Sequence, residues 1–570
     1  MLKGNVMKKY FILTIIIFLA LASCNKNVNE QNKWGKFVDN FIAEYLDMNP
    51  TSAVEAGLHE YDGTFGDLSA SGIKKQIDWL YNKRAGAQNF EAKTLDNKQR
   101  FERGQLYAVI DKKLFWLETA QVPFKNPAFY LGKINPSVYL TREYAPLDVR
   151  MKAYIKYAGN LPAVLKQMKA SLQLPLPKTF AVLGRNAFKG YVDFFKNDLP
   201  GIFSSVKNEK LQNDFKKTNK EAIKSVTGIG DWFEEILPES NGSYALGQEN
   251  FKKMLWETER VNISLEELKK IGEADLERNL IALKKACEKI IPGKPIIECM
   301  DFVMSNKPEG GAVEGAREQL KSLNKLVKDR HIVSIPFEEE ALVDEAPPYN
   351  RWNFAYIEFP GIYEKDLPAI YYIAPPDTAW PEDVQQKYIP GKTRLIFTSV
   401  HEVWPGHFLH SLHIKKSGSE LSGIFWSYAF GEGWAHYTEE MMYDEGLGDF
   451  DPEYKVGQLT AALLRNIRFL SAIGLHTEGM TPEQSEKMFI EKGHINPGDS
   501  KQQAARGTFD PAYLNYTMGK LIIIKLRDDW LSANPDKSLK NFHDTFLSYG
   551  AAPIPLVRKE MMGSEKGSLF

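Results

Sequence analysis

Apolar residues recur every three or four positions over much of this 570-residue chain, the spacing that places them on one face of an α-helix. Short Pro- and Gly-containing stretches, such as Pro200-Gly201 and Pro292-Gly293, separate these segments. The pattern predicts helices over Trp34–Met48, Leu95–Leu117, Ala145–Leu174, Glu209–Val226, Leu265–Ile290, Leu395–Lys415, Ser427–Asp444, Val456–His476, Pro482–Lys492 and Pro511–Ser532.

One region departs from this spacing. The stretches Ile332–Pro336, Trp352–Ile357 and Ala369–Ile373 are short and rich in β-branched and aromatic residues, and they predict strands of a small sheet. The expected fold class is mainly α, with a large helical body and a small sheet just before the helix that starts near Leu395. A chain of this length exceeds one ordinary core, so we expect an N-terminal helical lobe over 34–330 and a second lobe over 331–570.

Composition narrows the class of protein. Hydrophobic residues make up 43% and charged residues 25% of the chain, as in folded globular proteins. The 72 Lys and Arg residues balance the 73 Asp and Glu residues, for a net charge of -1. This balance gives no support to nucleic-acid binding.

The N-terminus reads as a targeting segment. Lys8 and Lys9 precede the apolar run Tyr10–Ala22, which is too short to span a bilayer as a helix. The run ends in Leu21-Ala22-Ser23-Cys24, which resembles the lipobox of bacterial lipoproteins. We expect a signal peptide over 1–23, lipidation of Cys24, a tether over 24–33, and a mature protein anchored in the cell envelope, periplasmic or at the surface; an ordinary secretory signal cut elsewhere is the alternative.

The remaining cysteines, Cys287 and Cys299, are twelve residues apart. An exported compartment permits a disulfide between them, and two reduced, buried thiols are the alternative.

The residues with the clearest chemistry are His401-Glu402-Val-Trp-Pro405-Gly406-His407, followed by Glu432-Gly433-Trp434-Ala435. A zinc-binding helix commonly carries two His at i and i+4 with a Glu beside the first. Here Pro405 stands at i+4 and the second His at i+6, which a regular helix would turn away from His401. Because Pro405 lacks a backbone donor and Gly406 tolerates unusual dihedral angles, we predict a break after Trp404 that returns His407 to the face of His401.

These two motifs resemble those of the bacterial domain-of-unknown-function family 885. Asn49-Pro50-Thr51-Ser52-Ala53 and Gly57–Asp62 resemble its opening motif, and Tyr516–Gly519, Leu526-Arg527 and Phe542–Asp544 its closing motifs. The resemblance implies a gluzincin-type zinc metallopeptidase whose helical body is similar to carboxypeptidase Taq and the angiotensin-converting enzyme. Departures from the family pattern at His410, Ala472 and Asp510-Pro511-Ala512 bear on substrate preference rather than on the ligands.

The roles that follow are one Zn²⁺ per chain held by His401, His407 and Glu432, with Glu402 as general base. His436 and His410 are alternative second imidazoles. By resemblance, Tyr516 and His476 are oxyanion donors, with Tyr513 one turn before Tyr516. Candidates for binding a substrate carboxylate are Arg465, Arg468, Arg506 and Arg527.

The function expected is hydrolysis of short peptides by an envelope-anchored zinc metallopeptidase, carboxypeptidase- or dipeptidase-like, with 331–570 as the catalytic lobe. The alternative is a catalytically degenerate lipoprotein that binds peptides or envelope partners in the same cleft. The sequence leaves the oligomeric state open.

Overall fold

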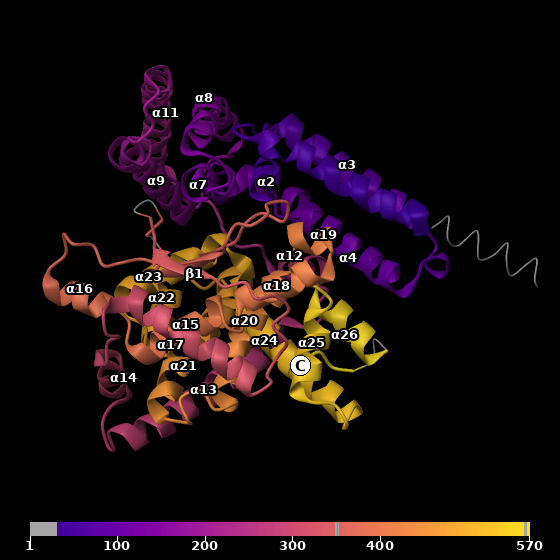
Figure 1. Cartoon of the computed structure of the whole chain (residues 1–570), viewed down its shortest axis with the longest axis vertical. Coiled ribbons are helices and arrows are strands. Elements are labelled where there is room, and N and C mark those ends of the chain that lie inside the picture. Colours follow the sequence, from indigo (N-terminus) through magenta and orange to yellow (C-terminus); the bar gives the residue numbers. More distant parts are fainter. Residues whose placement is uncertain (1–30, 348–349, 352, 564–566) are drawn as a thin grey trace, which may run out of the picture.

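The structure is a computed structural model that describes residues 31–347, 350–351, 353–563 and 567–570. It is mainly α-helical with one three-stranded sheet, which confirms the expected fold class. Figure 1 shows the N-terminal helices, indigo to magenta, across one end of the molecule and the orange and yellow helices forming the larger body. Cys24 and the signal segment lie outside the described residues.

The N-terminal part begins with helical residues 31–48. The helices that follow are α2 (Pro50–Glu55), α3 (Ala70–Gln88), α4 (Asn97–Leu114), α5 (Val122–Lys125), α6 (Ala128–Leu131), α7 (Ser137–Thr141), α8 (Leu147–Ser171), α9 (Lys178–Asp193), α10 (Leu199–Ile202) and α11 (Glu209–Ile236). The body then begins with α12 (Gln248–Glu259), α13 (Leu265–Ile290), α14 (Ile296–Ser305) and α15 (Gly311–Asp329).

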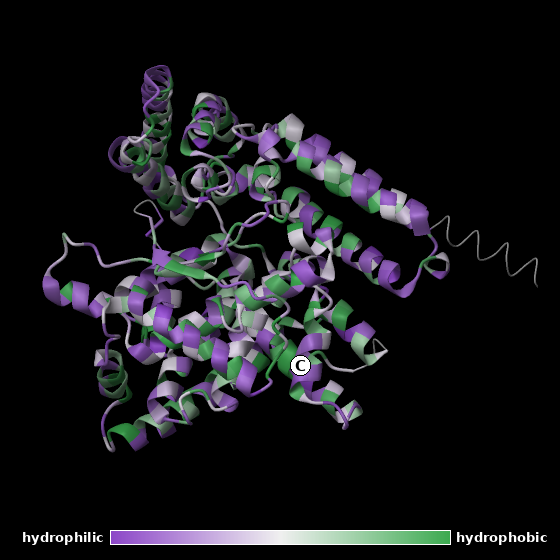
Figure 2. Ribbon diagram, in the orientation of Figure 1, coloured by the Kyte–Doolittle hydropathy of each residue, from purple (hydrophilic) through white to green (hydrophobic). Residues whose placement is uncertain are grey.

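After the sheet the chain is helical again. These helices are α16 (Glu382–Tyr388), α17 (Lys392–Glu402), α18 (His407–Ser417), α19 (Glu420–Ile424), α20 (Tyr428–Asp444), α21 (Pro452–Thr477), α22 (Pro482–Glu491), α23 (Pro497–Phe509), α24 (Asn515–Ala533), α25 (Leu539–Leu547) and α26 (Ile554–Met562). Most of them carry both hydrophobic and hydrophilic residues, as Figure 2 shows, because one face of each packs inward.

The sheet contains β1 (Leu342–Glu345), β2 (Ala355–Glu358) and β3 (Ile370–Ile373) in the order β1-β3-β2. β3 is central, parallel to β1 and antiparallel to β2. The strands predicted at Trp352–Ile357 and Ala369–Ile373 correspond to β2 and β3. The strand predicted at Ile332–Pro336 is wrong: this stretch is irregular, and Ser334 is held instead by Asp544, whose carboxylate accepts hydrogen bonds from the Ser334 N–H and hydroxyl at 2.7 Å each.

The hydrophobic core is divided differently from the expected lobes. One cluster packs side chains between Val54 and Phe233, and another packs residues 34–117 against Leu421 and Phe425. The largest cluster joins α12 to α15 with the sheet and the C-terminal helices. This large core therefore crosses the boundary expected at residues 330 and 331, and α13 packs along α21 inside it.

The open question about the cysteines is settled in favour of pairing. Cys287 in α13 and Cys299 in α14 form a disulfide whose Cα atoms are 5.6 Å apart. No helix in the described ranges is both long and apolar enough to cross a membrane.

Candidate metal centre

The helix that carries His401 stops before it reaches His407. α17 ends at Glu402, Val403 has non-helical dihedral angles, and α18 starts at His407. The predicted interruption is present but begins two residues earlier than expected. Pro405 disfavours the α region for Trp404, the residue before it, and Val403 has already left that region, with φ -124° and ψ -75°. The Trp404–Pro405 peptide bond is cis.

Gly406 is required at the return of the chain. Its N–H donates to the carbonyl oxygen of Val400 at 3.0 Å, which brings the backbone back against the end of α17. A Cβ at this position would collide with the carbonyl oxygen of His401. The turn therefore allows no side chain here, and the sequence Pro405-Gly406 directs His407 back toward His401.

His401, His407 and Glu432 converge on one point. The Nε2 atoms of both histidines lie 3.3 Å from the same carboxylate oxygen, Oε2 of Glu432. One potential ligand atom from each of the three side chains lies within 4.8 Å of the others. Tetrahedral coordination with bonds of roughly 2.0–2.2 Å separates ligand atoms by roughly 3.3–3.6 Å, so the two separations of 3.3 Å fit a zinc-sized ion.

A further observation favours a cation at this point. Oε2 of Glu432 is buried, and no described group donates it a well-formed hydrogen bond despite the two nearby imidazoles. A buried acceptor without a donor is unfavourable unless something else supplies positive charge. Two imidazoles and one carboxylate are the donor set expected for catalytic zinc, with one coordination position left open.

The second motif holds Glu432 in place through its neighbours. Gly433 of α20 faces Gly519 of α24 so closely that a Cβ on either would collide with the other backbone. Trp434 Nε1 donates to the carbonyl oxygen of Pro405 at 2.9 Å. The Glu-Gly-Trp segment thus supplies a ligand, a close helix contact and an anchor for the break that returns His407.

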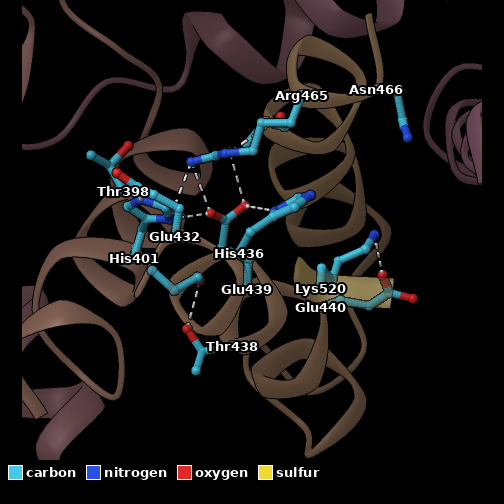
Figure 3. Close-up of polar contacts among 12 residues, drawn as sticks. Thr398, His401, Glu432, His436, Thr438, Glu439, Glu440, Arg465, Asn466 and Lys520 are labelled. Carbon is cyan, nitrogen blue, oxygen red and sulfur yellow. Dashed lines mark hydrogen bonds and ion pairs between the residues drawn. The ribbon is translucent and has the colours of Figure 1, made fainter. Parts of the chain in front are cut away.

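His401 is oriented by a carboxylate on its other side. Its Nδ1 lies 2.7 Å from Oε1 of Glu439, which is fully buried. Glu439 follows Glu432 on the same face of α20. Figure 3 shows Glu439 between His401, His436 and Arg465. Arg465 donates to Glu439 at 3.2 Å, and His436 Nδ1 is 3.3 Å from the same carboxylate. A carboxylate behind a ligating imidazole fixes its tautomer and raises its basicity.

The charges of these groups depend on one another. Burial alone would raise the pKa of Glu432, but His407 and His401 lower it well below its usual value. Burial also raises the pKa of Glu439, yet Arg465 and the two histidines lower it far below its usual range. Both carboxylates are therefore ionised at neutral pH, as a cation site needs.

Glu402 lies beside the three convergent side chains but is not one of them. It ends α17 beside His401 and has no hydrogen-bond partner among the residues described. Burial raises the pKa of Glu402, while His401 and His407 lower it. A carboxylate whose pKa moves upward toward neutrality suits a general base.

Comparison with known proteins identifies the family. Residues 50–561 match the family described as "Bacterial protein of unknown function (DUF885)". The chain belongs to this family. Two solved structures are similar, each with a TM-score of 0.77: "a putative lipoprotein of unknown function" from Shewanella oneidensis, at 22% identity over 93% of this chain and 99% of that one, and "the putative lipoprotein" from Colwellia psychrerythraea, at 17% identity over 94% and 99%. No protein of curated description matches the chain.

In this DUF885 protein Tyr516 also reaches the centre. Its ring lies 6.3 Å from the His401 ring and 5.7 Å from the Tyr428 ring, centroid to centroid. The guanidinium groups of Arg465 and Arg468 lie over it at 5.5 and 5.0 Å. The Tyr516 hydroxyl has no hydrogen-bond partner among the described groups, so it is available to a substrate oxygen.

The structure does not bring His476 to the centre. Its Nε2 donates to the carbonyl oxygen of Gly507 at 2.8 Å, and its Nδ1 accepts from the N–H of Leu246. Burial lowers the pKa of His476 to about 4, and its ring packs on Phe251. Both ring nitrogens therefore make hydrogen bonds within the fold, and the geometry does not support the role of oxyanion donor suggested by the resemblance.

The alternative imidazoles are also committed elsewhere. Nε2 of His410 donates to the Gly550 carbonyl oxygen at 2.8 Å, and Nε2 of His413 donates to that of Ser334 at 2.8 Å. His436 faces Glu439 rather than Glu432, and Tyr513 is buried under Gly507. Of the four histidines near the motif, only His407 joins His401 on Glu432.

Two residues of the centre were not predicted from sequence. No role was predicted for Glu439, and Arg465 was predicted only as a candidate for binding a substrate carboxylate. Their pairing joins α20 to α21, helices whose contact the sequence does not reveal. The available signal was the seven-residue spacing between Glu432 and Glu439, which places both on one helical face.

Proposed function

We propose that this protein is a zinc-dependent metallopeptidase of the gluzincin type that hydrolyses short peptides bearing a free C-terminal carboxylate. The observation that carries the proposal is the convergence of His401 and His407 Nε2 on Glu432 Oε2, 3.3 Å from each, beside an unpaired Glu402. His401, His407 and Glu432 would hold one zinc ion. When bound, zinc polarises a peptide carbonyl and acidifies a water molecule.

The protein's own groups would supply the remaining steps. Glu402 takes a proton from the attacking water and returns it to the leaving amine, as a carboxylate with a raised pKa can do. The Tyr516 hydroxyl donates to the oxygen on which negative charge develops. Glu439 keeps the His401 ring oriented throughout.

The preference for a carboxylate rests on Arg468. Arg468 is only 8% exposed, and its guanidinium lies over the Tyr516 ring. Nε donates to the Gln503 side chain at 2.8 Å, and no described carboxylate pairs with it. Burial lowers the pKa of Arg468, and Arg506 and Arg465 lower it further. A cation so placed is completed by a substrate carboxylate, which Arg binds bidentately.

We further propose attachment to the cell envelope through a lipid on Cys24. The lipobox-like Leu21-Ala22-Ser23-Cys24 supports this, as do the two structural relatives described as lipoproteins. Replacing Cys24 by Ser should move the protein from the membrane fraction to the soluble fraction. Retention of the variant in the membrane fraction would contradict lipid anchoring.

The deciding experiment compares Glu402→Gln with the wild type, using a library of short peptides read by mass spectrometry and zinc content measured by atomic absorption. We expect turnover to fall roughly 10²–10⁴-fold, with zinc bound one per chain in both proteins. Glu491→Gln, at an exposed position of α22, is the matched control and should match the wild type. Zinc binding without hydrolysis by any of these proteins would favour the non-catalytic peptide-binding lipoprotein instead.

A further inference from the structure

A second site lies outside the metal centre. A cavity of about 290 Å³ lies between α3, α4 and the segment 424–427 that leads into α20. In Figure 1, α3, α4 and α19 lie together at this end of the molecule. The described residues that line it include none of His401, His407 and Glu432. Its volume is at the lower end of the range for small-molecule sites.

The cavity has an unusual combination of walls. Much of its surface is aromatic, contributed by Trp79, Trp116, Phe129 and Phe425, with the half-exposed Trp426 at its edge. Three lysines also line it, and no Asp or Glu does. Aromatic faces accept a flat apolar group, and a surplus of ammonium groups attracts an anion.

The first lysine is accounted for by the fold. Lys112 donates to the carbonyl oxygen of Trp426 at 3.1 Å. It interacts electrostatically with Glu259, which is 1% exposed and accepts hydrogen bonds from the Ser427 hydroxyl and the Tyr428 N–H. Burial lowers the pKa of Lys112, and Glu259 raises it. These two charges compensate each other, so Lys112 contributes little to the surplus.

The other two lysines form no ion pair within the described part of the chain. Lys113 donates to the Tyr45 hydroxyl at 2.8 Å, and its Nζ lies 4.1 Å from the Tyr45 ring centroid and 5.0 Å from that of Phe425. Lys133 Nζ lies 5.4 Å from the Phe129 ring centroid, and within the described ranges it has no hydrogen-bond or ion-pair partner. Neither ammonium forms an ion pair with a described carboxylate, although Glu55 is close enough to raise the pKa of Lys133.

The positive charge of the two lysines changes the pKa of Tyr45. Burial alone would raise the pKa of its phenol, but Lys113 and Lys133 lower it to about 8. Burial lowers the pKa of Lys133 and Lys113 lowers it further, while Tyr45 and Glu55 raise it. The two ammonium groups therefore repel each other, and Tyr45 interacts with both.

We propose that this cavity binds a small organic carboxylate whose flat apolar body packs on the aromatic walls and whose charge lies between Lys113 and Lys133. This site goes beyond the proposed peptidase function, since neither its residues nor its ligand take part in zinc binding or hydrolysis. The match rests on charge, aromatic surface and volume together.

The test is calorimetric titration of the full mature chain with indole-3-acetate as an aromatic carboxylate, its neutral counterpart indole-3-acetamide, and inorganic phosphate as a bare anion. We expect binding of indole-3-acetate, at least roughly tenfold weaker binding of the amide, and no measurable binding of phosphate. Lys133→Gln should weaken indole-3-acetate binding roughly tenfold or more, because it removes a charge-assisted contact. Lys166→Gln, at an exposed position of α8, is the matched control and should leave the affinity unchanged.

The thermal unfolding midpoint distinguishes ligand binding from a structural role of Lys133, because a structural lysine would lower the midpoint when replaced. If the lysine serves the ligand, Lys133→Gln removes repulsion with Lys113 and leaves the thermal unfolding midpoint of the free protein unchanged or raised. Lys133→Arg keeps the charge and should retain binding. Equal binding of indole-3-acetate and its amide, unchanged affinity in Lys133→Gln, or absence of indole-3-acetate binding to the wild type would each overturn the proposal.

Discussion

α20 carries two buried carboxylates, Glu440 and Glu432, whose surroundings differ. On one side Glu440 accepts from Lys520 at 3.0 Å and from Arg278 at 2.9 Å, and Lys520 also contacts Asp275. On the other side Glu432 faces two imidazoles at 3.3 Å without a well-formed hydrogen bond. Figure 3 shows both sides of the helix. The first cluster is closed by hydrogen bonds and ion pairs among the chain's own residues, and the second is not.

This difference separates charges that hold the fold from charges that would bind a metal ion under the proposed function. A saturated buried network stabilises the arrangement of α13, α20 and α24, and removing one partner strands the rest. The incomplete cluster has the donor set of a metal site and is kept in shape by Glu439 and Arg465 behind it. The predictions below test this separation, from the largest expected effect to the smallest.

The largest effect is expected from removing Lys520, the buried partner of Glu440 and Asp275. Lys520 is fully buried, so Lys520→Met leaves Glu440 and Asp275 with only Arg278 and two asparagines. Loss of one partner from a buried ionic network should lower the free energy of unfolding by about 3–5 kcal/mol. Urea unfolding measures it, with Lys325→Met, from an exposed pair with Asp329, as a control that should change by less than about 0.5 kcal/mol. An equally small change in Lys520→Met would show that this side is not structural.

The pH dependence of that loss sharpens the comparison. Burial would raise the pKa of Glu440, but Lys520 and Arg278 lower it well below the ordinary 4.5. A carboxyl group with a lowered folded-state pKa contributes stability above its unfolded pKa and loses it as the pH falls. The destabilisation by Lys520→Met should therefore be full at pH 7 and shrink below about pH 4.5, where the stranded carboxyl groups take up protons. Urea unfolding of both proteins at pH 7 and pH 4 checks this, and a difference that grows in acid would contradict it.

The next largest effect is expected from Glu439, the carboxylate that contacts His401 behind the candidate metal centre. Glu439→Gln keeps the size of the side chain but removes the negative charge between His401 and Arg465. We expect zinc affinity to fall roughly 10–100-fold, measured by competition with a chelator, while folding is retained. Glu491→Gln again serves as the control. Unchanged zinc affinity in Glu439→Gln would show that the carboxylate does not orient the ligand.

How much of this could be predicted from the sequence follows from which interactions are local. The break at Pro405-Gly406, the helices and two of three strands follow from backbone chemistry over a few residues. β1 was missed because Leu342-Val-Asp-Glu345 is short, half polar and mostly exposed, and it is a strand only through its pairing with β3. Ile332–Pro336 has strand composition but lies where Asp544 holds it.

The site divides in the same way. The three convergent side chains are close to two sequence motifs, and their placement could be argued from spacing. Glu439, Arg465 and the Lys520 network join helices far apart in the chain, so no local pattern reveals them. The extent of the large core could not be predicted from local patterns either. The contact of α13 with α21 spans nearly 200 residues and crosses the boundary expected near residue 330.

The smallest expected effect concerns the unpaired guanidinium beside the incomplete side. Arg468→Gln should raise KM roughly tenfold for peptides with a free C-terminal carboxylate, because a charge-assisted contact made by bound substrate is lost. The corresponding C-terminally amidated peptides should be poor substrates of the wild type and should change little in the variant. Arg468→Lys retains the charge but not the bidentate geometry and should restore only part of the affinity.

Matched variants make this result specific. Arg185→Gln, on α9 of the N-terminal part, should leave both kinds of peptide unaffected. If Arg468 only packs on Tyr516, its replacement would lower hydrolysis of free and amidated peptides alike, because the tyrosine would move for both. Discrimination between the two peptide classes, lost selectively in Arg468→Gln, is the result that assigns the unpaired charge to the substrate rather than to the fold.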